Sequence, residues 1–175
     1  MEIDLSDFTT RLYAMLPSLA LMPDIETPPP SLSATATTTT TTTTALAQPS
    51  VSDTLFRALE LAFSHRTSAS GASSPPWRSA AFAKRLLTAS LQWPAPTAAR
   101  AVAFVGSLLE RDPKLEALLS TEDRSVDGVY RPELDDPQLC NPFGTSLWEL
   151  PVLARTHGSP QVRDAAEKLL HRTAP

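Results

Sequence analysis

Residues 96–111 read PTAARAVAFVGSLLER. Apolar side chains recur there at intervals of three and four residues: Ala98, Val102, Val105, Leu108 and Leu109. This spacing places them on one face of an α-helix, because about 3.6 residues complete a helical turn. Pro96 suits the first turn, where a missing backbone N–H loses no hydrogen bond. The stretch therefore predicts an amphipathic helix over about 96–111.

The same spacing predicts three further helices before this one. The first covers about 4–21, the second about 52–65, and the third begins at Pro75 and Pro76 and ends near the WPAP break. The stripe of the first helix is Leu5, Phe8, Leu12, Met15, Leu16 and Leu19. The second has Ser52 or Asp53 as its cap and Leu55, Leu59, Ala62 and Phe63 inward. The third has Trp77, Ala81, Leu86, Ala89 and Leu91 inward, with Lys84 and Arg85 pointing outward.

Three shorter helices are predicted after it. One begins at Pro113, one covers about 145–157 with Thr145 as its cap, and one follows Ser159 and Pro160. The stretch HGSPQVRDAAEKLL resembles the second helix of a HEAT-type repeat. The sequence thus predicts an all-α fold of stacked antiparallel helices, either a HEAT-like α-solenoid segment or a compact bundle.

Residues 27–50 differ from the rest of the chain. They contain three consecutive prolines and eight consecutive threonines and offer almost no apolar surface. Such a stretch cannot offset its ordering entropy, so we predict a disordered poly-Thr loop between two packed helices.

The composition excludes several classes of protein. The formal net charge is −4, so no overall electrostatic field attracts nucleic acid. A single cysteine excludes an internal disulfide, and no apolar run is long enough to span a membrane. Only 5 glycines disfavour Gly-rich phosphate loops, and we expect no cofactor and no small-molecule substrate.

Residues 121–150 read TEDRSVDGVYRPELDDPQLCNPFGTSLWEL and are the least regular part of the chain. Asp123, Ser125, Asp127 and Gly128 match the first places of a calcium loop, but Leu134 stands where the bidentate glutamate belongs. Cys140 has no second cysteine for a zinc site. The Gly144–Ser146 pair lacks the closing glycine of a nucleophile elbow. We therefore predict no metal site and no enzyme.

The alternative is a structural strap that holds helices together. Apolar side chains occur in this polar segment every four to five residues: Tyr130, Leu134, Leu139, Phe143 and Trp148. Prolines between them keep the backbone extended, and each buried aromatic contributes about 1.5–3 kcal/mol. We expect these side chains to insert between helices and to order the loop.

A basic strip is a candidate for nucleic-acid contact. Arg78, Lys84, Arg85 and Arg111 could share one face of the third and fourth helices. Without aromatic residues interleaved for base stacking, a solvated helix face is the favoured reading. Lys84 and Arg85 are retained as candidate RNA contacts.

An ordered set of short motifs resembles a known family. STEDR at 120–124, DGVY at 127–130, the acidic–proline stretch at 135–137, Cys140–Asn141 and TSLWE at 145–149 follow one another. Together they resemble the C-terminal part of the nucleolar complex protein 3 family, which carries a CCAAT-binding-factor-type domain. By this resemblance residues 1–26 supply the first helix of that domain and 51–172 the rest. Family members are much longer, so the chain looks like a C-terminal fragment or a truncated product.

The resemblance implies a scaffold in ribosome biogenesis. Family members act as a heterodimer with nucleolar complex protein 2 and support maturation of the 60S pre-ribosome, rRNA processing and transport through the nucleus. The strap residues Tyr130, Leu134, Asn141, Phe143, Trp148 and Glu149 then become candidate structural or partner contacts. Alternatives are a calcium-responsive module, or an interaction module linked to DNA replication and chromatin. The implied location is the nucleolus.

Overall fold

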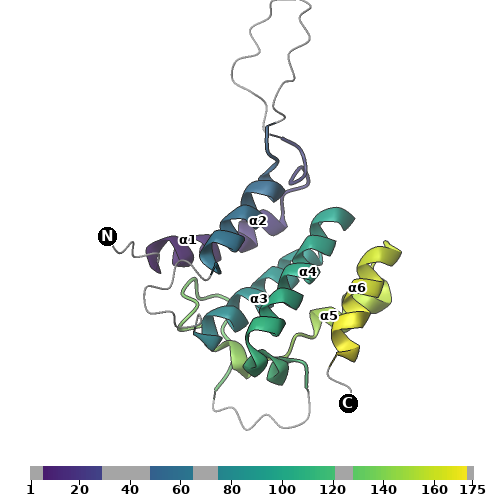
Figure 1. Ribbon diagram of the computed structural model, residues 1–175. Coiled ribbons are helices and arrows are strands. Elements are labelled where there is room, and N and C mark those ends of the chain that lie inside the picture. Colours follow the sequence, from purple (N-terminus) through teal and green to yellow (C-terminus); the bar gives the residue numbers. More distant parts are fainter. Residues whose placement is uncertain (1–5, 29–47, 65–74, 121–127, 173–175) are drawn as a thin grey trace, which may run out of the picture.

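Helices supply the regular structure of the part of the chain that the computed structural model describes, residues 6–28, 48–64, 75–120 and 128–172 (Figure 1). This confirms the predicted all-α class. The α-helices are α1 (Ser6–Ala20), α2 (Val51–Ala62), α3 (Pro76–Ser90), α4 (Ala95–Arg111), α5 (Glu149–Thr156) and α6 (Pro160–His171). Two 3₁₀ helices, η2 (Pro113–Leu118) and η3 (Pro142–Gly144), lie between α4 and α5.

The helices are arranged in pairs that follow one another through the molecule. α3 and α4 form the middle pair, with α1 and α2 on one side and α5 and α6 on the other (Figure 1). α1 packs on α3, and α6 packs on α4. A row of packed helix pairs is compatible with the predicted helical solenoid.

The central helix α3 is buried almost all round. Its buried residues include every position from Ser79 to Leu87, because α1, α4, α5 and both 3₁₀ helices contact it. The prediction of a single apolar face on this helix is therefore too narrow. A helix enclosed on every side must satisfy its polar side chains internally, and this requirement shapes the candidate site described below.

A chain of aromatic rings joins four elements across the core. The ring of Phe82 on α3 lies 5.2 Å from that of Tyr13 on α1 and 5.1 Å from that of Phe63 at the end of α2. Phe63 in turn lies 5.8 Å from Phe104 on α4. The tilted and edge-on angles are those that aromatic quadrupoles favour, so the chain fixes how these helices meet.

Distant side chains secure the start of α4. Its N-cap residue, Pro94, has no side chain that can cap. The Glu26 carboxylate instead accepts hydrogen bonds from the backbone N–H and hydroxyl of Thr97, at 2.9 and 2.8 Å. Next to it, the indole of Trp93 donates to the Leu19 carbonyl at 2.9 Å. The segment after α1 is thereby tied to the α3–α4 turn.

The cap of α2 differs from the prediction. Ser50 is the N-cap, and neither Ser52 nor Asp53 takes that place. The Ser50 hydroxyl accepts from the Asp53 N–H at 3.0 Å, and the Asp53 carboxylate accepts from the Ser50 N–H at 3.1 Å. This reciprocal capping box starts the helix at Val51. The inward residues of α2 are as predicted, with Leu55, Leu59, Ala62 and Phe63 all buried.

The apolar stripe of α1 is rotated relative to the prediction. The side chains of Phe8 and Met15, assigned to the stripe, are 39% and 55% exposed. The buried positions of the helix are Thr9, Leu12, Tyr13 and Leu16. Tyr13 is the central residue of this face, because its ring contacts both Phe82 and the guanidinium of Arg85 on α3.

The helix predicted over 145–157 begins later, at Glu149. Thr145 is therefore not its cap, and Trp148 takes the N-cap position without a side-chain hydrogen bond. The later start places Pro151 third in α5, within the first turn, where an N–H has no helical partner in any case. Most of the loop predicted over 27–50, its residues 29–47, lies outside the described residues, and its last residue, Ser50, is the ordered cap of α2. Residues 121–127 of the calcium-like pattern also lie outside the described residues.

Candidate functional site

The strap, defined here as residues 128–148, lies between η2 and α5 and folds back on itself. The Arg131 N–H donates to the Cys140 carbonyl at 2.8 Å, which closes the segment into a loop. At its far end the Leu147 N–H donates to the Leu118 carbonyl at 2.9 Å. Two backbone bonds across long loops thus fix the path of the strap over α3.

Two glycines and one asparagine bring the two arms of the strap together. Gly128 has a φ of +124°, and a Cβ there would lie 2.6 Å from the Asn141 side-chain nitrogen. A Cβ on Gly144 would lie 2.9 Å from the Tyr130 nitrogen. Asn141 itself has a left-handed φ of 48°. Only glycine at positions 128 and 144 leaves room for the Asn141 side chain, which lies close to both. Asn141 is therefore a structural part of the strap.

The predicted anchors of the strap are only partly where we expected them. Tyr130, Leu134 and Phe143 are half-buried and pack against the core. Leu139 and Trp148 are 63% and 49% exposed, so the prediction that both insert between helices is wrong. Buried positions that the pattern did not single out do this instead: Cys140, Pro142 and Leu147.

Lys84 lies beneath the strap, and the prediction that it points outward is wrong. Its residue is only 2% exposed. The ammonium Nζ lies 2.8 and 2.9 Å from the two carboxylate oxygens of Glu149 and donates to the Ser146 carbonyl at 2.7 Å. Glu149 is fully buried and also accepts from the Thr88 hydroxyl at 2.7 Å. A buried cation persists when it is paired and hydrogen-bonded in this way.

Arg85 is buried in the same manner, against the prediction of an exposed side chain. Its guanidinium donates to four oxygens: those of the Tyr13, Pro132 and Leu134 carbonyls and of the Asp135 carboxylate, at 2.7–3.1 Å. The guanidinium carbon also lies 3.8 Å from the centre of the Tyr13 ring. The planar, five-donor group suits this multiple recognition. Neither Lys84 nor Arg85 is available on the surface for RNA.

Behind Arg85, three titratable groups are held in their neutral forms. Burial raises the pKa of the Tyr13 hydroxyl far above its usual range, with the Cys140 thiol beside it as a further cause. Burial raises the pKa of Tyr130 to about 12 and also raises that of Cys140. These groups therefore stay protonated at neutral pH, and the thiolate needed for nucleophilic chemistry is disfavoured.

A groove of about 590 Å³ opens above Lys84 and is called the strap groove here. Its walls come from the end of α1, the end of α3, the strap and the start of α5: Pro17, Leu21, Leu91, Tyr130, Pro132 and Trp148. Its floor contains Lys84 and Glu149. The Lys84 ammonium lies 4.9 Å from the Trp148 ring, so the tryptophan covers the cation while its other side faces solvent.

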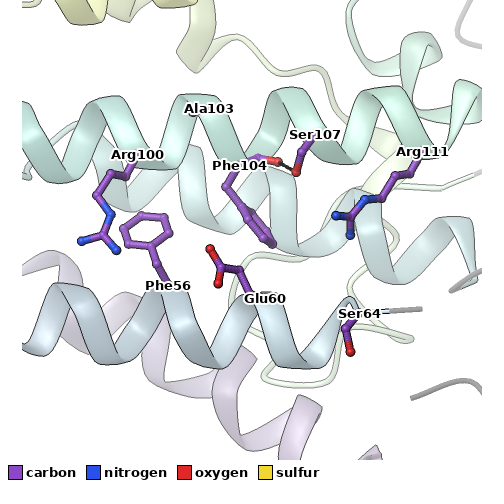
Figure 2. Close-up of a pocket in the computed structure, with 8 residues that line it drawn as sticks. All are labelled: Phe56, Glu60, Ser64, Arg100, Ala103, Phe104, Ser107 and Arg111. Atoms are coloured by element: carbon purple, nitrogen blue, oxygen red, sulfur yellow. Dashed lines mark hydrogen bonds between the residues drawn. The ribbon is translucent and has the colours of Figure 1, made fainter. Parts of the chain in front are cut away.

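A second groove, of about 470 Å³, lies between α2 and α4 (Figure 2). Glu60 of α2 lies between the two arginines of α4, Arg100 and Arg111, in this view. Arg100 pairs with Asp53 at 2.8 Å and stacks on Phe56, and Arg111 donates to the Phe63 carbonyl at 2.9 Å. Unlike the cations under the strap, these two arginines are exposed. This groove presents charges of both signs to solvent.

Within the described ranges, no group of three or more His, Cys, Asp and Glu side chains is placed to hold a metal ion. In the same part of the chain, no helix has the length and apolar character needed to cross a membrane.

The functional residues that sequence reasoning missed are the partners of the two cations. Tyr13 and Thr88 were not singled out, and Glu149 was named without its role. The signal was present in residues 80–89, AAFAKRLLTA, where two adjacent cations interrupt an otherwise apolar run. Since an enclosed helix cannot leave charges unpaired, this run should have predicted buried counter-groups elsewhere.

Comparison with known protein families matches residues 1–166 to one described as the CBF/Mak21 family. The match covers α1 to α5 and the first half of α6, including the strap and both buried cations. The chain belongs to the CBF/Mak21 family.

Individual relatives bear a consistent name. The chain is 29% identical over 99% of its length to "Nucleolar complex-associated protein 3" of Schizosaccharomyces pombe, and 32% identical over 98% of its length to the protein of the same name in Saccharomyces cerevisiae. It is 39% identical to the human "Nucleolar complex protein 3 homolog" over 53% of the chain. The chain spans 22% and 25% of the two yeast relatives. The resemblance drawn from the motifs is thus confirmed.

Proposed function

We propose that this chain is a non-catalytic scaffold module in ribosome biogenesis, acting in the nucleolus. More specifically, it supports maturation of the 60S pre-ribosome and its transport through the nucleus and export, as part of a heterodimer with nucleolar complex protein 2. The observation that carries the proposal is the family match over residues 1–166, together with relatives named for a nucleolar complex.

The geometry supports a shape-building role for the strap region. The two buried cations of α3 hold the strap: Lys84 donates to the Ser146 carbonyl while it pairs with Glu149 of α5, and Arg85 donates to two strap carbonyls. Tyr13 and Cys140 are the buried side chains that could in principle act as an acid or a nucleophile, and burial raises both of their pKa values and keeps them protonated. Buried, fully partnered groups that fix the path of the strap support the proposal of a non-catalytic scaffold.

The test uses the endogenous protein that contains this sequence, tagged in its own organism. Affinity purification should recover nucleolar complex protein 2 and 60S precursor rRNA, and depletion should lower free 60S subunits on a sucrose gradient. Recovery of neither the protein nor the RNA would overturn the proposal.

A matched pair of variants makes the test specific to this segment. Glu149→Leu leaves Lys84 buried without its counter-ion and should release the strap, whereas Leu139→Ala changes an exposed strap side chain. If the strap builds the scaffold, Glu149→Leu should reduce recovery of both partners and Leu139→Ala should not. Equal recovery from both variants would show that the strap has no part in the assembly role.

A further inference from the structure

The rim of the strap groove exposes large apolar side chains that the fold does not cover. Leu21, which follows α1, and Trp148, at the end of the strap, both line the groove and are 81% and 49% exposed. The groove has the volume of a typical binding cleft, about 590 Å³. Apolar walls of this kind gain free energy when another apolar surface displaces water from them.

The floor of the groove restricts what can occupy it. Lys84 has both Glu149 oxygens and the Ser146 carbonyl as partners, so its charge is already compensated. A phosphate or carboxylate entering the groove would meet Glu149 together with Lys84 and find no uncompensated cation. The chemistry of the floor therefore disfavours RNA and anionic ligands and favours an uncharged, apolar group.

The strap edge of the groove is acidic. Residues 131–136 read RPELDD and carry three acids against one arginine, and Pro132 among them lines the groove. Glu133 is exposed, and the Asp135 side chain remains 68% exposed although it pairs with Arg85. A partner that covers the groove meets this edge, and its own basic residues would complement it.

From these features we infer that the strap groove docks an amphipathic helix of the heterodimer partner. One bulky apolar side chain of that helix seats between Leu21 and Trp148, and lysine or arginine residues beside it face Glu133 and Asp135. An apolar face laid in a groove with charges at its margin is a recurring mode of helix recognition. This inference rests on the proposed function, because the partner is the one proposed there.

The experiment measures binding of purified nucleolar complex protein 2 from the same organism to the full-length protein by biolayer interferometry. Leu21→Asp puts a charge on the apolar wall at an exposed position, and Glu133→Lys reverses the acidic edge. The matched controls are Leu139→Asp and Glu116→Lys, which change exposed residues outside the groove lining. Circular dichroism checks that all four variants keep the helical content of the wild type.

We expect Leu21→Asp to weaken binding tenfold or more, and Glu133→Lys to weaken it several-fold with a reduced dependence on salt. Both controls should bind as the wild type does. If Leu21→Asp binds as tightly as the wild type, the docking site is overturned while the heterodimer stands. If the wild type itself does not bind, the proposed heterodimer fails, and this inference fails with it.

A photo-crosslinker at position 21 identifies the occupant directly. Crosslinking of the wild-type complex should place position 21 on a partner segment with apolar residues at helical spacing and basic residues beside them. A crosslink to RNA, or to another part of the same polypeptide, would overturn the assignment.

Discussion

Two cations of α3, Lys84 and Arg85, and the two cations of the adjacent helix α4, Arg100 and Arg111, lie in opposite environments. Lys84 and Arg85 on α3 are 2% and 5% exposed, whereas Arg100 and Arg111 on α4 lie on the surface of the α2–α4 groove (Figure 2). The difference does not arise in the helices themselves. It arises because the strap crosses α3 and nothing among the described residues crosses the outer face of α4 in the same way.

The comparison shows that the buried pair specifies the path of the strap. A desolvated cation tolerates only an arrangement that supplies its counter-charge and acceptors, so Lys84 requires Glu149, and Arg85 requires the carbonyls at 132 and 134. The exposed pair imposes no such requirement, because water solvates whatever the protein leaves unbonded. Charge under the strap thus selects one conformation, and charge in the α2–α4 groove does not.

Glu149→Leu should cause the largest loss of stability on the buried side. The substitution leaves the Lys84 ammonium buried without its carboxylate, and breaking a buried pair in this way costs about 3–5 kcal/mol. Urea denaturation should show this loss in the free energy of unfolding. The corresponding change on the exposed side, Asp53→Asn opposite Arg100, removes a solvent-screened ion pair and weakens the capping box with Ser50, and its effect should still be smaller.

A double variant separates pairing from packing. Lys84→Met combined with Glu149→Leu removes both charges and should recover most of the stability that Glu149→Leu loses, since an apolar pair can replace a buried ion pair. A double variant no more stable than Glu149→Leu would mean that shape, and not the unpaired charge, causes the loss.

Arg85→Lys keeps the positive charge and tests whether the hydrogen bonds of the buried guanidinium stabilise the fold. Lysine cannot reproduce a planar fork that reaches four oxygens, so some of those buried acceptors lose their donor. We expect a loss of about 2 kcal/mol in the free energy of unfolding, in line with charged hydrogen bonds left unmade. Arg100→Lys is the matched control and should cost less than about 0.5 kcal/mol, as surface substitutions usually do. Equal losses for the two variants would contradict the distinction between the two pairs.

The parts that sequence reasoning predicted correctly depend on local periodicity. The helices of the described part occur close to their predicted positions, and the inward residues of α2 are as expected, because spacing along one helix determines its buried face. The family followed from an ordered set of motifs in the strap. These inferences needed no knowledge of how distant segments meet.

The errors arose where tertiary contacts overrule local pattern. Lys84 and Arg85 occupy positions that look solvated on an isolated helix, and they are buried by the strap together with Tyr13 of α1 and Glu149 of α5. Met15 fits a three-four stripe as well as Tyr13 does, but the cation of Arg85 selects Tyr13. Trp148 was expected inside from its place in the apolar spacing of the strap, whereas it packs on Lys84 and remains 49% exposed. Each of these outcomes depends on residues 47 to 72 positions away along the chain.

Gly144→Ala tests whether the strap must also close on itself. The new methyl group would lie 2.9 Å from the Tyr130 nitrogen and 3.0 Å from the Gly128 carbonyl, both of them backbone atoms that cannot easily move. We expect a loss of about 1–3 kcal/mol, as for overpacking elsewhere, and faster amide exchange at Arg131. Gly158→Ala is the control, because a Cβ there meets nothing within 4 Å. Unchanged exchange at Arg131 would show that the two arms hold together without this contact.

The smallest expected effects are changes in the pH dependence of the free energy of unfolding, which run in opposite directions for Tyr130 in the strap and Asp53 on α2. The pKa of Tyr130 is raised to about 12 in the folded state, from an ordinary value of 10.0. Its contribution to stability is therefore complete below pH 10 and declines as the pH rises toward 12, because the unfolded chain releases its proton first. On the other side, the pKa of Asp53 is lowered from 3.8 by hydrogen bonds from Ser50 and Arg100. Its contribution is present above about pH 4 and declines as the pH falls through the lowered value.

Urea denaturation across the pH range, with one variant for each side, distinguishes the two contributions. Tyr130→Phe should make the decline between pH 10 and 12 less steep and leave the acid limb unchanged, with the raised pKa values of Tyr13 and Cys140 accounting for the decline that remains. Asp53→Asn should change the acid limb and leave the alkaline decline as it is. The alkaline decline should coincide with phenolate absorbance appearing on unfolding, because burial keeps the ring neutral in the folded chain. If Tyr130 instead ionised near pH 10 in the folded protein, the strap would be open to water at that ring. The contrast between a covered α3 and an open α4 would then lose its physical basis.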